Sequence, residues 1–515
     1  MSDQTIEAPP AFERPASPRR EAARRRERSF ISFAQAYPWV FWGAALLVFS
    51  LIVVLWARAR PGYDPYGWLV WGKLSIRGAL DTNGAPSWKP LPFLFTVPYA
   101  IFGHYQLWLW MVTSIAISLC GPIFAWRIAF RLTPADPARR YAAYVAGLFA
   151  AAFVLGMQDP LLPANYVHYI LSAESDTMIV ALVLAAIDCH LNGRHRWAFW
   201  IWWLGSLGRP EVWPFWLLAG AWLWRSDPTY RRWLVFSVLF LLFMWFGIPG
   251  LTSKSVFTAA NVAQNSAREC HGNKVTCTLT RYHELHANPI WILAGLSVVW
   301  AAWRRNLLIL ALTAGALAWL IIEVALAIKG FPGVPRYMFE SGAVVAILAG
   351  IFIGRLILAV PPRLSVLLRR VRGLHLSPRL STQLAGWATG LLVLVIAGSL
   401  LPAAHRQFRL ERADLREQRA RTVLIGRMSG VIKRLGAAHI LACGQPNIPI
   451  EYQSTFAFYT DVKIGELYVS QNYERLHPHP LVNMYPIAGA GWKVFPSDTD
   501  AASAARCSGL TLVYH

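Results

Sequence analysis

The chain has 515 residues, of which 56% are hydrophobic and only 15% are charged. Soluble globular domains carry about a quarter charged residues, so this composition excludes an ordinary soluble enzyme. The 25 Trp residues are typical of membrane proteins, where Trp gathers at the lipid–water interfaces. The net charge of +22 comes largely from arginines beside apolar runs. A nucleic-acid surface would be expected to carry base-stacking aromatics among them, whereas membrane orientation needs only their position.

Eleven apolar stretches follow one another along the chain, and a spanning helix needs about 20 residues. They lie at 38–57, 106–125, 140–157, 173–190, 196–207, 211–224, 233–249, 289–303, 306–328, 338–359 and 384–402. This pattern predicts a polytopic α-helical membrane protein with about eleven transmembrane helices. The first stretch follows a long tail and lacks a small-residue cleavage site, so we expect a retained helix and not a removed signal peptide.

Arginines fall on alternate connections between these stretches. If the Arg-rich tail 1–37 is cytoplasmic and disordered, every inside connection is basic. These connections are 126–139, 191–195, 225–232, 304–305 and 360–383. The positive-inside rule therefore predicts a cytoplasmic N-terminus and a C-terminus outside the cytoplasm.

Three longer segments then lie on the outer side, at 58–105, 250–288 and 403–515. The last has charged helical periodicity at 406–435 followed by Tyr-, Val- and Thr-rich pieces, which predicts a small extracytoplasmic α/β domain after the transmembrane domain 38–402.

Cysteines fall in pairs within these outer segments. Cys270 shares one outer loop with Cys277, and Cys443 shares the tail with Cys507, while Cys120 and Cys189 fall within predicted helices. Two even pairs favour disulfides in an oxidising compartment. Four free thiols remain the alternative, because spacing does not fix connectivity.

The first outer loop holds the strongest chemical candidate. Asp64 follows the first apolar stretch closely, and a Trp- and Tyr-rich segment from Tyr66 to Leu80 is expected to form an amphipathic helix in the interface. The turn-rich sequence "NGAPSWKPLP" then leads back toward the membrane.

This layout resembles the GT-C superfamily of integral-membrane glycosyltransferases, which take sugars from polyprenyl phosphate carriers. The resemblance covers most of the chain and rests on the order and placement of Asp64, Lys89-Pro90-Leu91-Pro92, "SAESD" at 172–176, "LGRPEVWP" at 207–214 and "GVPRYMF" at 333–339. Within the superfamily the chain looks most like actinobacterial envelope enzymes that use decaprenyl-phosphate mannose or arabinofuranose. The resemblance implies a polyprenyl-phosphate sugar donor, and an envelope glycan or glycolipid as acceptor.

An inverting transfer needs a carboxylate to take the acceptor's proton and cations to stabilise the departing phosphate. Asp64 fits the first role, and the superfamily places its base at this point. A turn-forming role beside Pro65 is the structural alternative, and Asp81 in "LDTNG" is the competing acid.

Arg336 and Lys89 are the predicted phosphate ligands, although Arg336 would also suit contact with lipid headgroups. Tyr337 could add a hydroxyl donor or belong to an aromatic belt. Further charged or polar groups are candidates for sugar binding or for supporting the site. They are Glu174, Asp176, Arg209, Glu211 and His168. Glu174 and Asp176 also suit the start of a helix.

No cofactor is predicted. The loop motif "YDPYG" has one acid where some superfamily members have an acidic pair, so we expect a metal-independent enzyme. "HPHP" at 477–480 has no neighbouring Cys or acid, and the chain lacks a P-loop motif for a nucleotide substrate. The rival classes are a lipid or glycan transporter or flippase, which would show inverted repeats, and an envelope polymerase or ligase of another membrane fold.

Overall fold

The computed structural model describes residues 38–84, 86, 88–134, 136–161, 164–264, 268, 270, 272–370, 377–467, 481–487, 491–497, 505–510 and 513–514. The chain forms two compact units, Met1–Ile52 and Val53–His515. Helix α2 (Pro38–Ala57) crosses the boundary, and everything below concerns the second unit. The predicted tail 1–37 and the "HPHP" motif lie outside the described residues.

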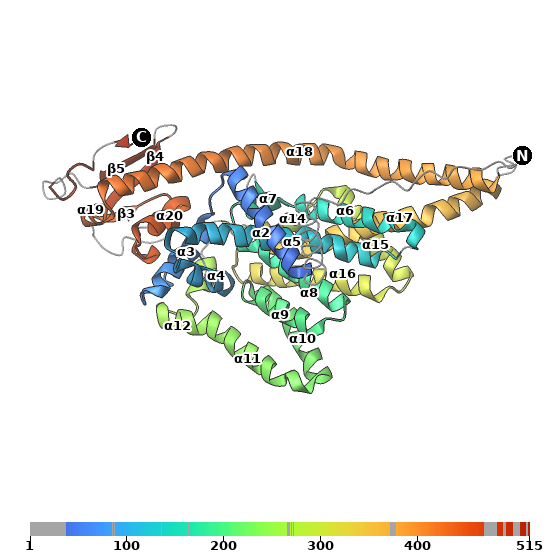
Figure 1. Ribbon diagram of the computed structural model, residues 1–515, viewed down its shortest axis with the longest axis horizontal. Helices are drawn as coiled ribbons and strands as arrows, with labels where there is room; N and C mark the ends of the chain where they lie inside the picture. Colours follow the sequence, from blue (N-terminus) through green and yellow to red (C-terminus); the bar gives the residue numbers. More distant parts are fainter. Residues whose placement is uncertain are drawn as a thin grey trace, which may run out of the picture. The chain divides into compact units, whose positions relative to one another are not determined.

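The second unit is mainly helical from α3 to α17 (Figure 1). Its α-helices are α3 (Tyr63–Ile76), α4 (Pro90–Ala100), α5 (Gln106–Leu132), α6 (Tyr141–Leu155), α7 (Tyr166–Leu171), α8 (Ser175–Leu191), α9 (His195–Ser206), α10 (Trp213–Ser226), α11 (Arg231–Leu242), α12 (Ile248–Thr252), α13 (Thr258–Gln264), α14 (Lys274–His283), α15 (Asn288–Trp303), α16 (Leu307–Ile328) and α17 (Phe339–Arg370). Short 3-10 turns precede several of them: η1 (Gly103–Tyr105), η2 (Pro137–Arg139), η3 (Pro210–Val212), η4 (Pro228–Tyr230) and η6 (Pro335–Met338). A π-helix, η5 (Phe243–Gly247), joins α11 to α12, and β1 (Gln158–Asp159) pairs antiparallel with β2 (Ala164–Asn165).

Each of the eleven predicted apolar stretches coincides with a helix. Six helical segments in the described part of the chain are long and apolar enough to cross a membrane, or seven if the bent pair α14 and α15 forms one span. Helices α8, α9 and α10 have only 17, 12 and 14 residues. The structure therefore supports a multi-pass membrane protein, while the count of eleven spans stays a prediction.

The end of the chain is organised around one long helix, α18 (Pro378–Leu435), which runs along one side of the second unit (Figure 1). After it come α19 (Ala437–Cys443), α20 (Ile450–Thr460), η7 (Ile464–Glu466) and a sheet of order β3-β4-β5-β6. Its strands are β3 (Gln445–Asn447), β4 (Leu481–Ile487), β5 (Gly491–Pro496) and β6 (Val513–Tyr514). Strand β3 is parallel to β4, whereas the β4–β5 and β5–β6 pairs are antiparallel, with Met484 opposite Val494.

Two predicted boundaries fall inside helices. The predicted start of the C-terminal domain at 403 lies within α18, which continues without a break from the apolar stretch 384–402. Similarly, α17 continues to Arg370, so Arg363 and its neighbours extend a helix instead of forming a loop. By its contacts the tail belongs to the same compact unit as the other helices, and an independently folded tail domain stays a prediction.

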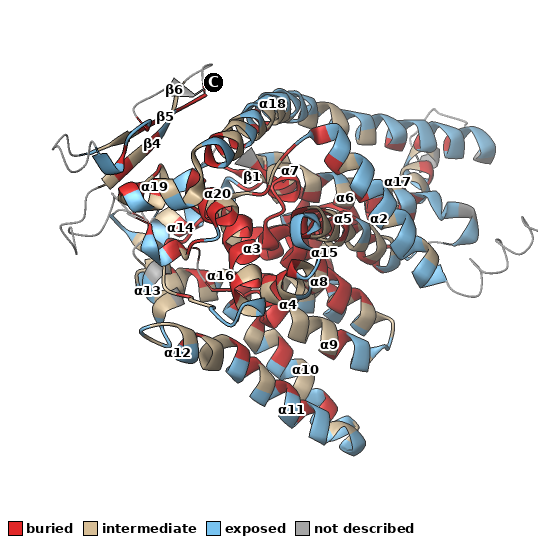
Figure 2. Ribbon diagram, turned by 60° about the vertical axis from the view of Figure 1, so that its left-hand side comes forward, coloured by how far each residue is buried: buried red, intermediate tan, exposed pale blue. Residues whose placement is uncertain are grey.

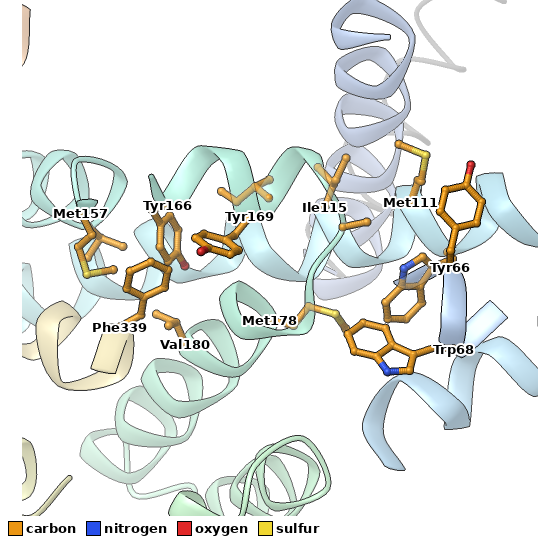
Figure 3. Packing of buried hydrophobic residues seen from close by; sticks show 14 of the residues in the cluster. Tyr66, Trp68, Met111, Ile115, Met157, Tyr166, Tyr169, Met178, Val180 and Phe339 are labelled. Atoms are coloured by element: carbon orange, nitrogen blue, oxygen red, sulfur yellow. The ribbon is translucent and has the colours of Figure 1, made fainter. Parts of the chain in front are cut away.

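Buried residues are concentrated around α3, α5, α8 and α20 (Figure 2). Aromatic rings fill much of this core: Trp68 meets Trp110 edge-on at 5.8 Å, and Phe339 lies 5.5 Å from both Tyr166 and Tyr169. Figure 3 shows Trp68, Tyr166, Tyr169 and Phe339 together with Met111, Met157 and Met178, which all belong to one hydrophobic cluster. Such packing ties the starts of α3, α8 and α17 to a common core.

Helix α3 differs from the predicted interfacial helix. Every residue from Pro65 to Gly72 is buried, so no polar face remains for water. The cover comes from α20 on one side and α4 on another: the Lys73 ammonium donates to the Phe458 carbonyl at 2.7 Å and lies 3.1 Å from Asp461. The amphipathic prediction was wrong because part of this cover comes from α20, almost 400 positions away in sequence.

The structure contains two disulfides, Cys270–Cys277 and Cys443–Cys507, which are the pairings expected from the sequence. Cys120 in α5 and Cys189 in α8 are free. The second disulfide closes the segment from α19 to the residues before β6.

The membrane orientation can be tested directly. We expect reporter fusions to place residues 1–37 and 360–383 in the cytoplasm and residues 403–515 outside, because the basic connections alternate along the chain. Thiol labelling of the native exported protein should leave Cys443 and Cys507 unmodified until reductant is added. A cytoplasmic reporter signal from the tail would contradict the topology.

Candidate active site

Most of the predicted site residues lie at the beginning of a helix. Asp64 is in the first turn of α3, Lys89 immediately precedes α4, Glu174 precedes α8 and Asp176 lies in its first turn. Arg209 precedes η3, and Arg336 lies in η6 directly before α17. Prolines at Pro90, Pro210 and Pro335 start three of these elements, as expected where the first N–H needs no partner.

These separate helix starts come together in space. The Leu91 amide donates to the Leu207 carbonyl at 2.9 Å, which holds the start of α4 beside the break before η3. The Gly62 amide donates to the Ser172 carbonyl at 2.8 Å, which holds the start of α3 beside that of α8. Residues that are widely separated in the sequence thus meet at one place.

Asp176 is the centre of the charged cluster. Its side chain is fully buried, and its two oxygens face three cations. One oxygen binds Arg209 directly, and the other lies 4.0 Å from both the Lys89 ammonium and the Arg336 guanidinium. The structure thus brings Asp176 together with all three predicted cations.

Asp64 joins this cluster from its accessible side. The Arg336 Nη2 lies 3.5 Å from Asp64 Oδ2, and each of these two side chains is 16% exposed. Asp64 therefore lies where a ligand from outside could reach it, next to a cation.

Neither Arg336 nor Lys89 has a described carboxylate within normal hydrogen-bonding distance. The carboxylate contacts of Arg336 are 3.5 and 4.0 Å long, beyond the range of about 2.7–3.2 Å typical of N–H···O bonds. Its Nε is buried and has no hydrogen-bond partner among the described residues. Lys89 donates to Ser175 Oγ at 3.0 Å. An anionic ligand would supply the missing acceptors.

The electrostatic environment of Lys89 also favours binding of an anion. Burial lowers the pKa of the Lys89 ammonium, and this effect outweighs the opposing attraction of Asp176. A bound phosphate would favour the charged form of this lysine.

Two further acids in the cluster were missed by the sequence analysis. Glu340 Oε1 lies 3.9 Å from Arg209 Nε, and the buried Glu323 of α16 interacts electrostatically with Glu211. Glu211 itself lies 3.7 Å from Arg209 Nη1. An ionisable residue in an apolar span is costly and usually functional, and by that rule Glu323 in "WLIIEVALAI" could have been found.

The cluster holds more carboxyl groups than cations, and two adjacent carboxyls cannot both be charged cheaply in a buried place. Glu211 and Glu323 are both buried and add to this excess of carboxyl groups. Glu211 and Glu340 approach Arg209 at Nη1 and Nε, whereas Asp176 binds Nη2.

Tyr337 lies between the two buried guanidinium groups. Its ring centroid is 4.1 Å from Arg209 Cζ and 5.6 Å from Arg336 Cζ. Cations over an aromatic face are attracted by the ring, so Tyr337 helps to hold both arginines in place. Its predicted role as a hydroxyl donor stays a prediction.

Glu174 is pressed against the start of α3. A Cβ atom added to Gly62 would clash with Glu174 Oε1, so the buried Glu174 carboxyl would have to move to admit any larger residue. Glu174 is 6% exposed, and its Oε2 has no partner among the described residues. The buried carboxyl thus fixes how closely the turn before Asp64 approaches α8.

Gly62→Ala is therefore expected to destabilise the protein by about 1–3 kcal/mol, the usual cost of overpacking. Thermal unfolding of the detergent-purified protein would measure this. Gly390→Ala in α18, where an added Cβ meets nothing within 4 Å, is the matched control. Adding Glu174→Ala to Gly62→Ala should recover part of the loss, and no recovery would mean that Glu174 does not cause it.

Two predicted residues lie elsewhere. Asp81 Oδ1 accepts from the backbone and side chain of Asn83, each at 2.8 Å, which is the turn-forming role that its sequence context allowed. His168 Nδ1 lies 2.6 Å from Asp414 Oδ1 on α18, and Gln418 donates to the other Asp414 oxygen. The structure thus assigns His168 to the contact between α7 and α18 and does not bring it to the charged cluster.

Helix α18 also holds the segment that leads to Asp64. Arg419 donates to the carbonyls of Trp56 and Ala57 at 2.9 and 3.0 Å, and Arg421 donates to the Pro61 carbonyl at 2.8 Å. The end of α2 and the start of α3 are therefore fixed by the C-terminal part of the chain.

No group of three or more His, Cys, Asp or Glu residues in the described part of the chain is arranged to hold a metal ion. Metal independence stays a prediction.

Comparisons with known proteins give structural neighbours but no sequence relatives. No protein-family model and no curated protein matches the chain. The chain is similar to the solved structure of ArnT from Cupriavidus metallidurans bound to undecaprenyl phosphate, with 15% identity, a TM-score of 0.45, and coverage of 88% of this chain and 94% of that one. It is also similar to the apo state of the same protein, with 14% identity, a TM-score of 0.46 and the same coverage.

The first of these structures contains undecaprenyl phosphate. At identities and TM-scores this low, the structural similarity carries no argument about the site or its substrate. The function has to be argued from the residues of this chain.

Proposed function

We propose that the chain is an inverting glycosyltransferase that moves a sugar from a polyprenyl-phosphate carrier to an envelope glycan or glycolipid on the outer face of the membrane. The observation that carries the proposal is the contact between a partly exposed carboxylate, Asp64, and an under-coordinated cation, Arg336, 3.5 Å away. On the motif resemblance described above, the sugar is arabinofuranose or mannose.

The cluster suits a lipid phosphate. Helix N-termini carry a partial positive charge and free N–H groups, which favour anions. Here the starts of α3, α4, α8 and α17 come together around Lys89 and Arg336. The Arg fork and the Lys point charge are the groups that proteins use for phosphate oxygens.

Asp64 supplies the base. In the proposed step, Asp64 takes the proton of the acceptor hydroxyl while that oxygen forms a bond to the anomeric carbon. The bond from this carbon to the phosphate oxygen breaks with inversion, and the phosphate leaves with the lipid. Arg336 and Lys89 stabilise the charge that develops on the departing phosphate.

The Asp64–Arg336 contact suggests how donor binding prepares the base. A phosphate near Arg336 competes with Asp64 for the same guanidinium. Donor binding would therefore draw Arg336 away and leave the Asp64 carboxylate free to accept a proton.

Purified protein should be given a panel of synthetic polyprenyl-phosphate sugars together with simple glycan acceptors. A product with a new glycosidic bond of inverted configuration is the expected result and would identify the donor. If the protein moves the labelled lipid across vesicle membranes and forms no such bond, it is a transporter and not a transferase.

A further inference from the structure

One face of α18 changes from apolar to basic along its length. The apolar part of this face consists of Trp387, Leu391, Leu394 and Leu401, which are 79%, 63%, 69% and 66% exposed. The basic part consists of Arg409, Arg412 and Arg416, all exposed. We call these three residues the arginine stripe.

Both sets occupy the same side of the helix. Successive residues are turned by about 100°, so steps of three and four keep a side chain on one face. The steps from Trp387 to Leu391 and Leu394, and from Arg409 to Arg412 and Arg416, are of this kind. Arg409 follows Leu391 by five full turns, which places the stripe in line with the apolar part.

The opposite face of α18 packs against the rest of the second unit. Asp414, Gln418 and Ile425 on that face are buried, and Asp414 binds His168. Among the described residues no carboxylate lies within ion-pair distance of the stripe, and Arg412 stacks only on the Phe408 ring, 5.8 Å away. Figure 2 shows exposed residues along the outer side of α18. The stripe therefore points away from the protein.

The apolar part of the face is lipid-facing if 384–402 spans the membrane, and the stripe then begins just beyond it. At about 1.5 Å per residue, Arg409 and Arg412 lie about 12 and 16 Å past Leu401, and Arg416 lies about 22 Å past it. Helical side chains tilt toward the N-terminal end of their helix, which here is the end inside the membrane. Long arginine side chains at 409 and 412 can therefore reach back to the headgroup layer.

We propose that Arg409 and Arg412 bind the phosphates of anionic phospholipids in the leaflet from which α18 emerges. A guanidinium donates two parallel hydrogen bonds to a phosphate. Arginines are less common on the outer side of a membrane than on the cytoplasmic side. Exposed arginines at this end of a lipid-facing helix are therefore expected to have an anionic partner nearby. The proposal holds for either membrane orientation and does not depend on the proposed sugar transfer.

The test uses the full-length protein in a neutral detergent, titrated with phosphatidylglycerol or phosphatidylcholine, with bound lipids counted by native mass spectrometry. Each basic residue near a membrane surface contributes about 1 kcal/mol to binding of anionic lipid. Arg409→Gln with Arg412→Gln should therefore weaken phosphatidylglycerol binding roughly ten- to thirtyfold and leave phosphatidylcholine binding unchanged. Arg409→Lys with Arg412→Lys keeps the charge and should retain most of the binding.

Arg416→Gln is the matched control on the same face, because its greater distance from Leu401 should make its effect small. Wild-type phosphatidylglycerol binding by the double glutamine variant would overturn the proposal. An equal loss in Arg416→Gln would also overturn it, because binding would then depend on the charge of the whole stripe, as for a soluble polyanion, and not on distance from the membrane. Binding of inorganic polyphosphate to the protein in phosphatidylcholine nanodiscs would then identify that alternative. Thermal unfolding of each variant shows whether a loss reflects misfolding.

Discussion

Asp64→Asn is expected to abolish most sugar transfer while leaving the fold and donor binding nearly intact. The amide keeps the shape of the side chain but cannot accept the acceptor's proton, and general base catalysis is typically worth about a hundred- to ten-thousandfold. Asp64 is partly exposed and has one ionic contact, at 3.5 Å, among the described residues, so its loss should cost little stability. Single-turnover transfer and equilibrium binding of polyprenyl phosphate would separate the two effects.

Asp81→Asn is the matched control, because Asp81 lies in the same loop but forms a turn with Asn83. This variant should retain near-wild-type turnover. If Asp64→Asn stays active and Asp81→Asn is inactive, the wrong carboxylate has been assigned. If both stay active, a transferase centred on this loop is excluded, and a transporter becomes the better interpretation.

The helical stretches and several site residues were accessible from the sequence, because their signals are local. Apolar runs long enough to span a membrane mark helices by composition alone, and each predicted run is helical in the structure. Asp176 and Arg209 stood out as charges among apolar residues, and the structure joins them directly. Local patterns identify charged groups that are costly to bury. Because a buried charge needs a partner of opposite charge, such groups are expected to pair in the fold.

What the sequence could not give is contact between distant segments. The burial of α3 depends partly on α20, and α18 holds the segment before it, whereas the Trp and Tyr residues of α3 would equally suit a lipid interface. His168 looked like a site residue because its partner, Asp414, is far away in the chain. Glu340 was missed for a different reason: it directly follows the motif "GVPRYMF", and only the fold brings it to Arg209.

Arg336→Ala should weaken donor binding and turnover together. Its proposed phosphate contact exists in the bound donor and strengthens in the transition state, as the leaving group gains charge. Removing the contact should therefore weaken donor binding and also slow transfer. A hydrogen bond to a charged group is worth about 1.5–3 kcal/mol, which corresponds to roughly a ten- to hundredfold weaker binding of polyprenyl phosphate. Binding of the sugar-free lipid phosphate measures this part of the effect without any transfer.

Binding of polyprenyl phosphate should distinguish the two variants. Asp64→Asn removes the carboxylate that competes for the Arg336 guanidinium, so this variant should bind polyprenyl phosphate at least as tightly as the wild type. Arg336→Lys keeps a charge but loses the planar fork, so we expect partial binding. Arg363→Ala, which changes an exposed arginine far along α17, the helix that follows Arg336, is the control for surface charge and should change neither quantity. If Arg336→Ala binds polyprenyl phosphate normally and loses only turnover, then Arg336 acts on Asp64 and not on the phosphate, and Lys89 with Arg209 must hold the donor.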